Sequence, residues 1–159
     1  MITYRRAEPS DIPVLVSMRL DMLEEENALS EGLKESVAEN AAAFAQNGLA
    51  EDTYVMWVAA DGPALVAMGG VNFFTLPPND WCPTGRTAYI SNMYTRPDYR
   101  RSGLAAAILA RLVDEAKDRS CQRILLVATQ AGRRLYEAAR FEDYEGAMAL
   151  FPFGILPQA

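Results

Sequence analysis

Polar and apolar positions change their spacing several times along the chain, and each spacing predicts a different element. Residues 2–7 alternate between the two kinds and predict a first strand. Ser10 is then expected to cap a helix that tolerates Pro13 in its first turn. The apolar positions of this helix fall on one face: Val14, Leu15, Met18, Met22 and Leu23. A second helix is expected over about residues 29–46, ending at Asn47-Gly48.

The middle of the chain predicts strands. Residues 53–60 and 65–74 are two apolar-rich runs joined by the turn sequence DGPA, which is typical of a β-hairpin. Gly69-Gly70 inside the second run predicts a bulge. After a proline-containing loop over residues 75–85, residues 87–95 predict another strand, which ends before a proline that cannot continue a ladder.

The last third of the chain predicts a parallel crossover. Apolar residues recur at helical spacing over residues 104–117, and residues 123–129 form a nearly continuous apolar run that predicts a buried strand. Strand, helix and strand in succession imply a parallel βαβ unit. A short helix near residues 132–139 and a final strand or hairpin over 141–151 complete the expected order. The expected fold class is α/β, with a mixed sheet and helices on both of its faces.

Composition narrows the chemistry. The length of 159 residues favours one domain, 1–159, with one core. The chain has no histidine, and Cys82 and Cys121 have neither metal-site spacing nor the pattern of a disulfide framework. Histidine-based catalysis and a metal site are therefore not expected, and any general base is a carboxylate, tyrosine, lysine, backbone group or water.

Charge and hydropathy limit the partners. A net charge of −6 argues against nucleic acid as a partner. No apolar run is long enough to cross a bilayer, and no leader pattern opens the chain. We therefore expect a cytoplasmic protein that does not engage a membrane.

Candidate chemistry begins in the stretch YRRSGLAAAIL, residues 99–109. The first amides of the predicted helix are free to bind an anion, and Gly103 permits a close approach to the main chain. Arg100 and Arg101 add positive charge. The pattern is neither a P-loop nor a Rossmann fingerprint. It indicates either a solvated basic turn or a pyrophosphate cradle, and its place between a strand and a strongly periodic helix favours the cradle.

The same residues carry a family resemblance. Arg100-Arg101-Ser102-Gly103-Leu104-Ala105 resembles motif A, [RQ]-x-x-G-x-[GA], of the GNAT superfamily of N-acetyltransferases. Residues 92–100 are similar to the fourth strand of that family and its exit, and Leu135-Tyr136-Glu137 resembles motif B. The resemblance is strong over residues 88–144, and the order of elements matches the fold over about 2–151. It implies the GNAT fold, a mostly antiparallel central sheet with a parallel βαβ splay.

The resemblance also implies a site for acetyl-CoA as co-substrate. It places the pyrophosphate on loop amides, which belong to Arg100, Arg101, Ser102, Gly103, Leu104 and Ala105. It places the pantetheine arm along Met93, Tyr94 and Thr95, whose main-chain N–H groups would also stabilise an oxyanion. It implies that Tyr136 protonates the departing thiolate and that Thr129 touches the coenzyme. The alternative role of Tyr136 is that of a core aromatic on an amphipathic helix.

The expected reaction is direct transfer of the acetyl group from the thioester to a primary amine of a small molecule or peptide. A non-catalytic acyl-CoA-binding regulatory module is the alternative, and a phosphate-sensing protein is a third. Three positions depart from the family pattern. Ser91, with Asn92 beside it, stands where many members carry a glutamate base, so the base is unassigned. Arg101 and Arg140 stand at positions where the two motifs often have glycine.

Two further features leave alternatives open. Acidic residues crowd the N-terminal region, and these include Glu24, Glu25, Glu26 and Glu31. They either attract a cationic amine or form a solvated helix face. The sequence does not decide whether the chain dimerises, and strand addition through residues 141–151 is one route to a homodimer.

Overall fold

The computed structural model describes residues 1–144, 146 and 148–153. It contains a five-stranded sheet in the order β1-β2-β3-β4-β5. The strands are β1 (Ile2–Arg6), β2 (Tyr54–Asp61), β3 (Ala64–Thr75), β4 (Arg86–Thr95) and β5 (Arg123–Leu125). The helices are α1 (Ile12–Glu25), α2 (Lys34–Glu51), α3 (Leu104–Asp118) and α4 (Arg133–Ala138).

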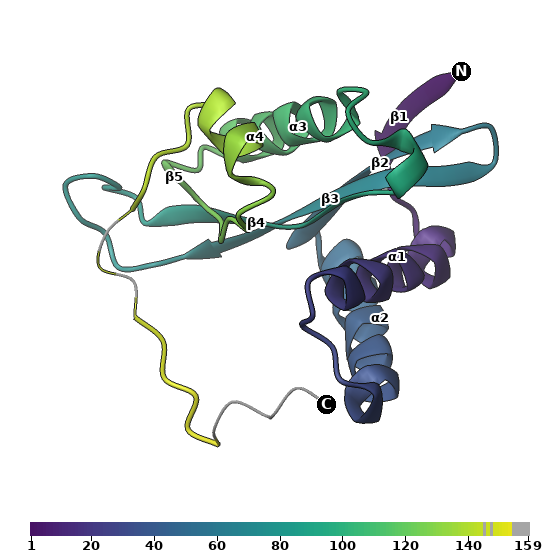
Figure 1. Cartoon of the computed structure of the whole chain (residues 1–159). Helices are drawn as coiled ribbons and strands as arrows, with labels where there is room; N and C mark the ends of the chain where they lie inside the picture. Colours follow the sequence, from purple (N-terminus) through teal and green to yellow (C-terminus); the bar gives the residue numbers. More distant parts are fainter. Residues whose placement is uncertain (145, 147, 154–159) are drawn as a thin grey trace.

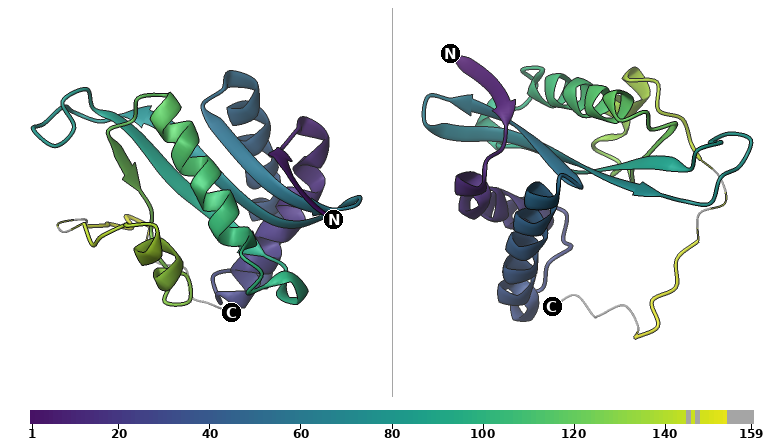
Figure 2. Two further views of the ribbon diagram at one scale, coloured as in Figure 1. Left: turned by 90° about the horizontal axis from the view of Figure 1, so that it is seen from above. Right: turned by 180° about the vertical axis from the view of Figure 1, so that it is seen from behind.

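Strand pairing confirms the predicted mixed sheet. Neighbouring strands are antiparallel from β1 to β4, and β4 pairs with β5 in parallel. Helices α1 and α2 lie against one face of the sheet, while α3 and α4 lie on the other (Figure 1). Views from other sides show α3 running along one face of the sheet, roughly in line with the strands, as the crossover between β4 and β5 (Figure 2). The parallel βαβ unit and the helices on both faces are therefore as predicted.

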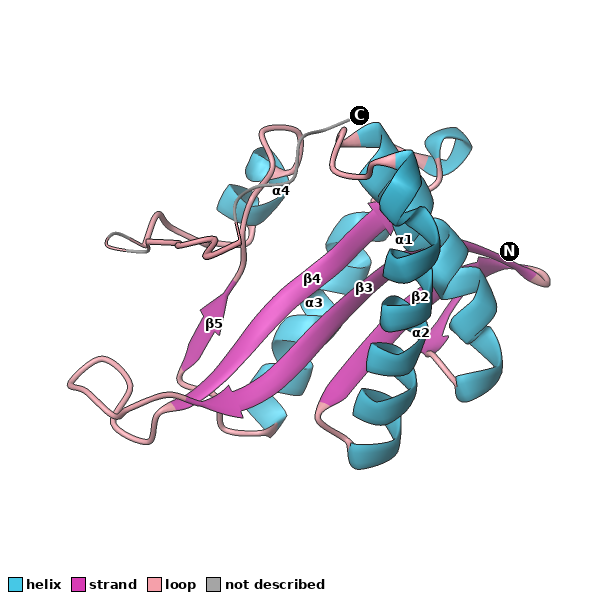
Figure 3. Cartoon of the chain, turned by 90° about the horizontal axis from the view of Figure 1, so that it is seen from below, coloured by secondary structure: helices cyan, strands magenta, loops and turns pink. Residues whose placement is uncertain are grey.

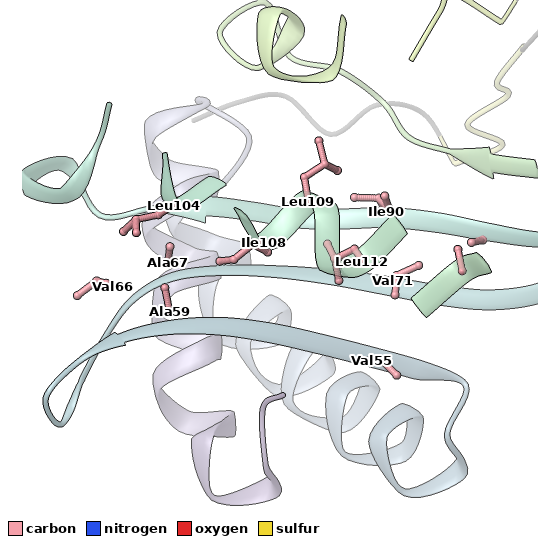
Figure 4. Packing of buried hydrophobic residues seen from close by; sticks show 12 residues of the cluster. Val55, Ala59, Val66, Ala67, Val71, Ile90, Leu104, Ile108, Leu109 and Leu112 are labelled. Carbon is pink, nitrogen blue, oxygen red and sulfur yellow. The ribbon is translucent and has the colours of Figure 1, made fainter. Parts of the chain in front are cut away.

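Two apolar layers hold the helices on the sheet. Leu104, Ile108 and Leu112 of α3 are buried against strand residues that include Ala67 and Val71 (Figure 4). Their spacing places them on one face of the helix, which explains why this helix was predictable. On the opposite face of the sheet, a second cluster joins α1 and α2 to the strands, and it contains Leu15, Met18, Ala45, Tyr54, Met56 and Met68.

A bulge interrupts the pairing of β3 and β4. The register shifts between Met68 and Gly70, and on the facing strand Asn92 has a left-handed φ of 57°. The glycine pair predicted the position of the irregularity, but the extra residue lies on β4, where Asn92 and Met93 lie opposite Gly69 alone. Neither glycine position has room for a side chain. A Cβ on Gly69 would lie 2.6 Å from Met93 Sδ, and a Cβ on Gly70 would lie 2.1 Å from Tyr54 Oη. The two glycines therefore let side chains approach the sheet closely from both faces.

Both predicted helix boundaries near the N-terminus need correction. Ser10 is not a cap: it lies within a 3₁₀ turn, Pro9–Asp11, and α1 begins after it. Asp11 fixes this turn, because its carboxylate accepts hydrogen bonds from the Glu8 N–H at 2.8 Å and from Arg5 Nη1 at 2.6 Å. Pro13 does lie in the first turn of α1, as predicted.

The second helix is shifted toward the C-terminus. A 3₁₀ turn, Glu31–Leu33, precedes α2, so the helix starts later than predicted. It also continues past Asn47-Gly48 to Glu51. Asp52 supplies the left-handed residue that ends it, with φ 56°, and the Thr53 N–H donates to the Gly48 carbonyl at 3.0 Å. Gly48 instead permits close packing, because a Cβ there would lie 2.5 Å from the Cβ of Tyr54.

The C-terminal predictions are partly wrong. Only Arg123–Leu125 of the run 123–129 forms a strand. The expected strand or hairpin over 141–151 is absent from its described residues, and Glu145 and Ala147 lie outside the described residues. Strand addition through this segment therefore has no support in the part that is described. Within the described residues, no helix is long and apolar enough to cross a membrane.

Candidate active site

The strands β4 and β5 diverge and expose a main-chain edge. Their parallel register runs from Thr87↔Arg123 to Tyr89↔Leu125 and goes no further among the described residues. Seen from below the sheet, β5 turns away from β4 toward α4 (Figure 3). Among the described residues, no strand pairs with the edge of β4 from Ser91 to Thr95 on this side, and the Arg100 side chain contacts the Thr95 carbonyl there. An unpaired strand edge can bind an extended ligand through its N–H and carbonyl groups, as an added strand would.

The bulge sets the direction of the side chains on this edge. In a regular strand, successive side chains point to opposite faces. Here Ser91 and Asn92 both line the same cavity beneath α1 and α2, whereas Met93 packs against the α3 side and Tyr94 returns to the α1 side. The extra residue of the bulge causes this change in alternation.

The loop before α3 presents main-chain donors to solvent. Arg101, Ser102 and Gly103 are exposed, and α3 starts at Leu104. Gly103 has φ 81°, and a Cβ placed on it would meet no protein atom within 4 Å. The first amides of a helix have no intrahelical acceptor, and the N-terminus carries partial positive charge. The loop therefore offers amides and open space to an anion such as a pyrophosphate.

The side chain of Arg100 is held by contacts within the protein. Its Nε donates to the Thr95 carbonyl at 2.9 Å, and its Nη2 forms an ion pair with Glu25 at 2.5 Å. The Tyr94 hydroxyl donates to the other carboxylate oxygen of Glu25 at 2.9 Å. The hydrogen bond from Arg100, followed by that from Tyr94, keeps the pKa of Glu25 below its usual value of 4.5. Arg100 thus connects Glu25, the last residue of α1, with Thr95, the last residue of β4.

The tyrosine of the expected motif B lies at the divergence of the strands. Tyr136 and Tyr89 line a second cavity of about 680 Å³, called here the α4 cavity, with residues of β5 and α4. Burial raises the pKa of Tyr136 above 10, and Glu26 and Tyr89 add to the rise, so the phenol is protonated at neutral pH. Phe141 packs edge-on against its ring, 6.1 Å between centroids. Thr129 Oγ1 accepts a hydrogen bond from the Gly132 N–H at 3.2 Å, at the start of α4.

The cavity beneath α1 and α2, called here the α2 cavity, has a volume of about 500 Å³. A hydrogen-bond chain crosses its sheet side: Arg19 Nη1 donates to Asn92 Oδ1, and Asn92 Nδ2 donates to the Tyr54 hydroxyl at 2.7 Å. Burial raises the pKa of Tyr54, so it too is protonated. Tyr89 lines both cavities, which places the α2 cavity next to the α4 cavity.

The expected site residues are therefore only partly brought together. Tyr136 and the β4 edge flank the strand divergence. Residues 100–103 follow the 3₁₀ turn Pro97–Tyr99 after β4, and Leu104 and Ala105 begin α3. Neither cavity is lined by that loop among the described residues. Sequence reasoning missed the chain formed by Arg19, Asn92 and Tyr54. The sequence did contain one indication of this chain, because Arg19 is the only basic residue of α1.

The acidic residues near the N-terminus do not line the α2 cavity. Glu25 pairs with Arg100, and Glu24 pairs with Lys34. The Glu24 and Glu25 carboxylates therefore have ionic partners of their own, which for these two residues favours a charged outer face over an amine-attracting wall. Glu26 differs, because its charge helps to raise the pKa of Tyr136.

Comparison with known proteins gives consistent matches. The model of the acetyltransferase (GNAT) family matches residues 19–141. Among solved structures, a predicted acetyltransferase with acetyl-CoA from Clostridium acetobutylicum is 34% identical, with a TM-score of 0.87 over 96% of this chain and 97% of that chain. A GCN5-related N-acetyltransferase from Ralstonia eutropha JMP134 has a TM-score of 0.85, covering 95% of this chain and 99% of that chain. At 22% identity, the second match shows the fold alone.

A curated relative matches over a shorter region. Thialysine N-epsilon-acetyltransferase from Bos taurus is 28% identical over 85 residues, which are 52% of this chain and 47% of the bovine protein. The chain thus matches about half the length of this relative.

Proposed function

Because the chain belongs to the acetyltransferase (GNAT) family, we propose that it transfers an acetyl group from acetyl-CoA to a primary amine of a small molecule or peptide. Family membership confirms the resemblance carried by the two motifs and acetyl-CoA as co-substrate. The bovine relative acts at an Nε amine, which supports a primary amine as acceptor. The single observation that carries the proposal is the exposed β4 edge beside a cavity, with a free helix N-terminus at its end.

The residues present fit acetyl-CoA. We propose that the amides of residues 101–105 hold the pyrophosphate, for which Gly103 leaves room. The Arg100 N–H, which the resemblance includes in this set, instead donates to the Pro97 carbonyl at 3.2 Å. The main chain of Met93, Tyr94 and Thr95 would hold the pantetheine arm as an added strand. Acetyl-CoA supplies the acetyl group as a thioester. Holding both reactants in fixed orientation lowers the entropic part of the barrier.

Three further roles in the reaction are assigned to the main chain of β4, to Tyr136 and to Thr129. Main-chain N–H groups near Met93–Thr95 would stabilise charge that develops on the carbonyl oxygen. Tyr136 keeps its proton because its pKa is raised, so it can donate a hydrogen bond or a proton to the leaving sulfur. Thr129 supports the start of α4 through its bond to the Gly132 amide, and we propose that it contacts the coenzyme from there.

The nucleophile is best supplied as a neutral amine. Among the described residues, no carboxylate lines the α2 cavity, and Arg19 contributes the one formal positive charge. The mainly apolar wall of the cavity disfavours the charged ammonium form by desolvation and lowers the pKa of an amine. We therefore assign proton removal to water rather than to a side chain at Ser91. On this view, the missing glutamate is compensated by a cavity that favours the uncharged nucleophile.

A release assay tests the proposal. CoA formation from acetyl-CoA is measured with a panel of primary amines, and acetyl-CoA binding is measured separately by calorimetry. Amine-dependent CoA release supports the transferase. Tight acetyl-CoA binding without release for any amine would instead support the non-catalytic module. We keep the single domain over 1–159, the cytoplasmic location and the homodimer as predictions outside this test.

A further inference from the structure

The α2 cavity has an unusual balance of charge. Its apolar wall comes from α1, α2 and β2, and it is formed by Leu15, Val16, Val37, Ala41, Phe44, Ala45 and Met56. Its polar groups are neutral except for Arg19, and they belong to Asn40, Tyr54, Asn72, Tyr89, Ser91 and Asn92. The described lining thus holds one formal cation and no anion.

Arg19 has more hydrogen-bond donors than its contact with Asn92 uses. A guanidinium carries five N–H donors, and the hydrogen bond to Asn92 uses one of them. Among the described residues, no Asp or Glu forms an ion pair with Arg19. The side chain is half-buried, so water offsets its charge only in part. A half-buried cation without a protein carboxylate is suited to bind an anion that enters the cavity.

Neighbouring acids on α1 do not supply that anion. Glu25 is held by Arg100, Glu24 by Lys34, and Asp21 lies 3.9 Å from Arg96. None of the three acids lines the cavity.

We propose that Arg19 binds a carboxylate of the acceptor, so that the acceptor is an amine with a carboxylate on a mainly apolar body. This rests on the proposed function, because it assigns the α2 cavity to the acceptor. A carboxylate matches a single guanidinium in charge and in its two-oxygen geometry, whereas a phosphate dianion would leave a charge uncompensated. A volume of about 500 Å³ suits an amino acid or a short peptide. The Asn92 contact would hold the guanidinium in place while its other donors face the ligand.

Matched acceptors provide the test. CoA release is measured with L-phenylalanine and L-lysine, each against its carboxamide, at saturating acetyl-CoA. Binding of the same four compounds to the protein loaded with CoA is measured by calorimetry, because CoA cannot acetylate them. The variants are Arg19→Met, Arg19→Lys and, as a control for net charge, Lys117→Met, an exposed residue of α3.

The expected result is a preference for carboxylate over carboxamide of about 10- to 100-fold in kcat/KM for at least one pair. Arg19→Met should abolish this preference by raising KM for the carboxylate alone, Arg19→Lys should retain part of it, and Lys117→Met should retain all of it. Equal use of carboxylates and carboxamides by the wild type would overturn the inference. So would equal slowing of both members of a pair by Arg19→Met, which would indicate that Arg19 only supports the bulge through Asn92.

The calorimetric binding measurement distinguishes failure of the proposed acetyltransferase activity from failure of the proposed carboxylate site. Arg19-dependent binding of a carboxylate without any CoA release supports the carboxylate site and contradicts the transferase. CoA release without discrimination in either arm supports the transferase and contradicts the carboxylate site. Absence of binding by all four compounds also contradicts the carboxylate site.

Discussion

Replacing Gly103 by valine tests the placement of the pyrophosphate. The backbone of Gly103 is left-handed, with φ 81°, which costs a residue with a Cβ about 1–2 kcal/mol. The added side chain would meet no protein atom within 4 Å, so steric clashes within the protein should add little to this strain. For a chain of this size, the melting temperature should fall by roughly 2–8 °C.

The valine methyl groups would instead occupy the open space in front of the loop amides. A pyrophosphate held by those amides must approach to hydrogen-bond distance, about 2.9 Å, which a side chain there prevents. Acetyl-CoA affinity should therefore fall by at least ~10-fold, equivalent to about 1.4 kcal/mol. Calorimetric titration with acetyl-CoA measures the affinity, and chemical denaturation measures the stability.

Gly62 offers a matched control. It lies in the turn between β2 and β3 with φ 57°, and a Cβ there would also meet no protein atom within 4 Å. Gly62→Val should therefore lose similar stability and keep its acetyl-CoA affinity. Undiminished affinity of Gly103→Val, or an equal loss in both variants, would refute the placement of the pyrophosphate on this loop.

Three further changes have distinct expected outcomes. Tyr136→Phe should lower kcat by about 100-fold or more with little change in acetyl-CoA affinity, and an unchanged kcat would remove it as the acid. Glu25 has a lowered pKa when folded, so its stabilisation is present above about pH 4.5 and is lost as the pH falls through the folded pKa. Glu25→Gln should thus cost about 0.5–1 kcal/mol at pH 7 and a smaller amount at pH 3 by denaturation, whereas an equal cost at both pH values would contradict the ion pair with Arg100. Arg140→Gly should raise stability by about 0.5–1 kcal/mol, because Arg140 has φ 67° after α4, and a lower denaturation midpoint would exclude strain there.

Much of the fold was predictable because periodicity reports burial. The crossover helix was found within one residue at its end, since Leu104, Ile108 and Leu112 form its buried face. The strands before it were found for the same reason. The end of α2 was predicted wrongly, because a glycine can either end a helix in the left-handed conformation or allow close packing within it. Gly48 serves close packing against Tyr54, and Asp52 takes the left-handed position that glycine usually occupies.

The apolar run after α3 was misjudged because hydrophobicity does not specify strand pairing. Residues 126–129 share the apolar character of β5, but β4 offers no paired register beyond Tyr89. Leu126 and Val127 line the α4 cavity instead of extending the sheet. The divergence of two strands depends on long-range geometry, so local sequence could indicate it only through the family resemblance.

Arg101 and Arg140 adopt the left-handed backbone conformation that glycine usually supplies at these motif positions. Arg101 and Arg140 have φ values of 59° and 67°, which are left-handed conformations that glycine adopts without steric penalty. After α4, the Phe141 N–H donates to the Tyr136 carbonyl at 3.0 Å and the Arg140 N–H to the Glu137 carbonyl at 2.9 Å. These bonds close the helix end as a glycine would. The departures at these positions therefore change the side chain and leave the turn intact.

The bulge between β3 and β4 was predictable from the sequence in its position, but its effect on the side chains of β4 was not. Gly69-Gly70 predicted an irregular strand, but not which side chains it would redirect. Because the bulge adds one residue, Ser91 and Asn92 both face the α2 cavity, and the next residues present the main-chain edge expected to bind the coenzyme. Gly70 in turn lets the Tyr54 hydroxyl reach Asn92. One backbone irregularity thus shapes both the proposed acceptor side and the proposed coenzyme side, so a change that straightens β4 should impair both, whereas a change at Arg19 should affect the acceptor alone.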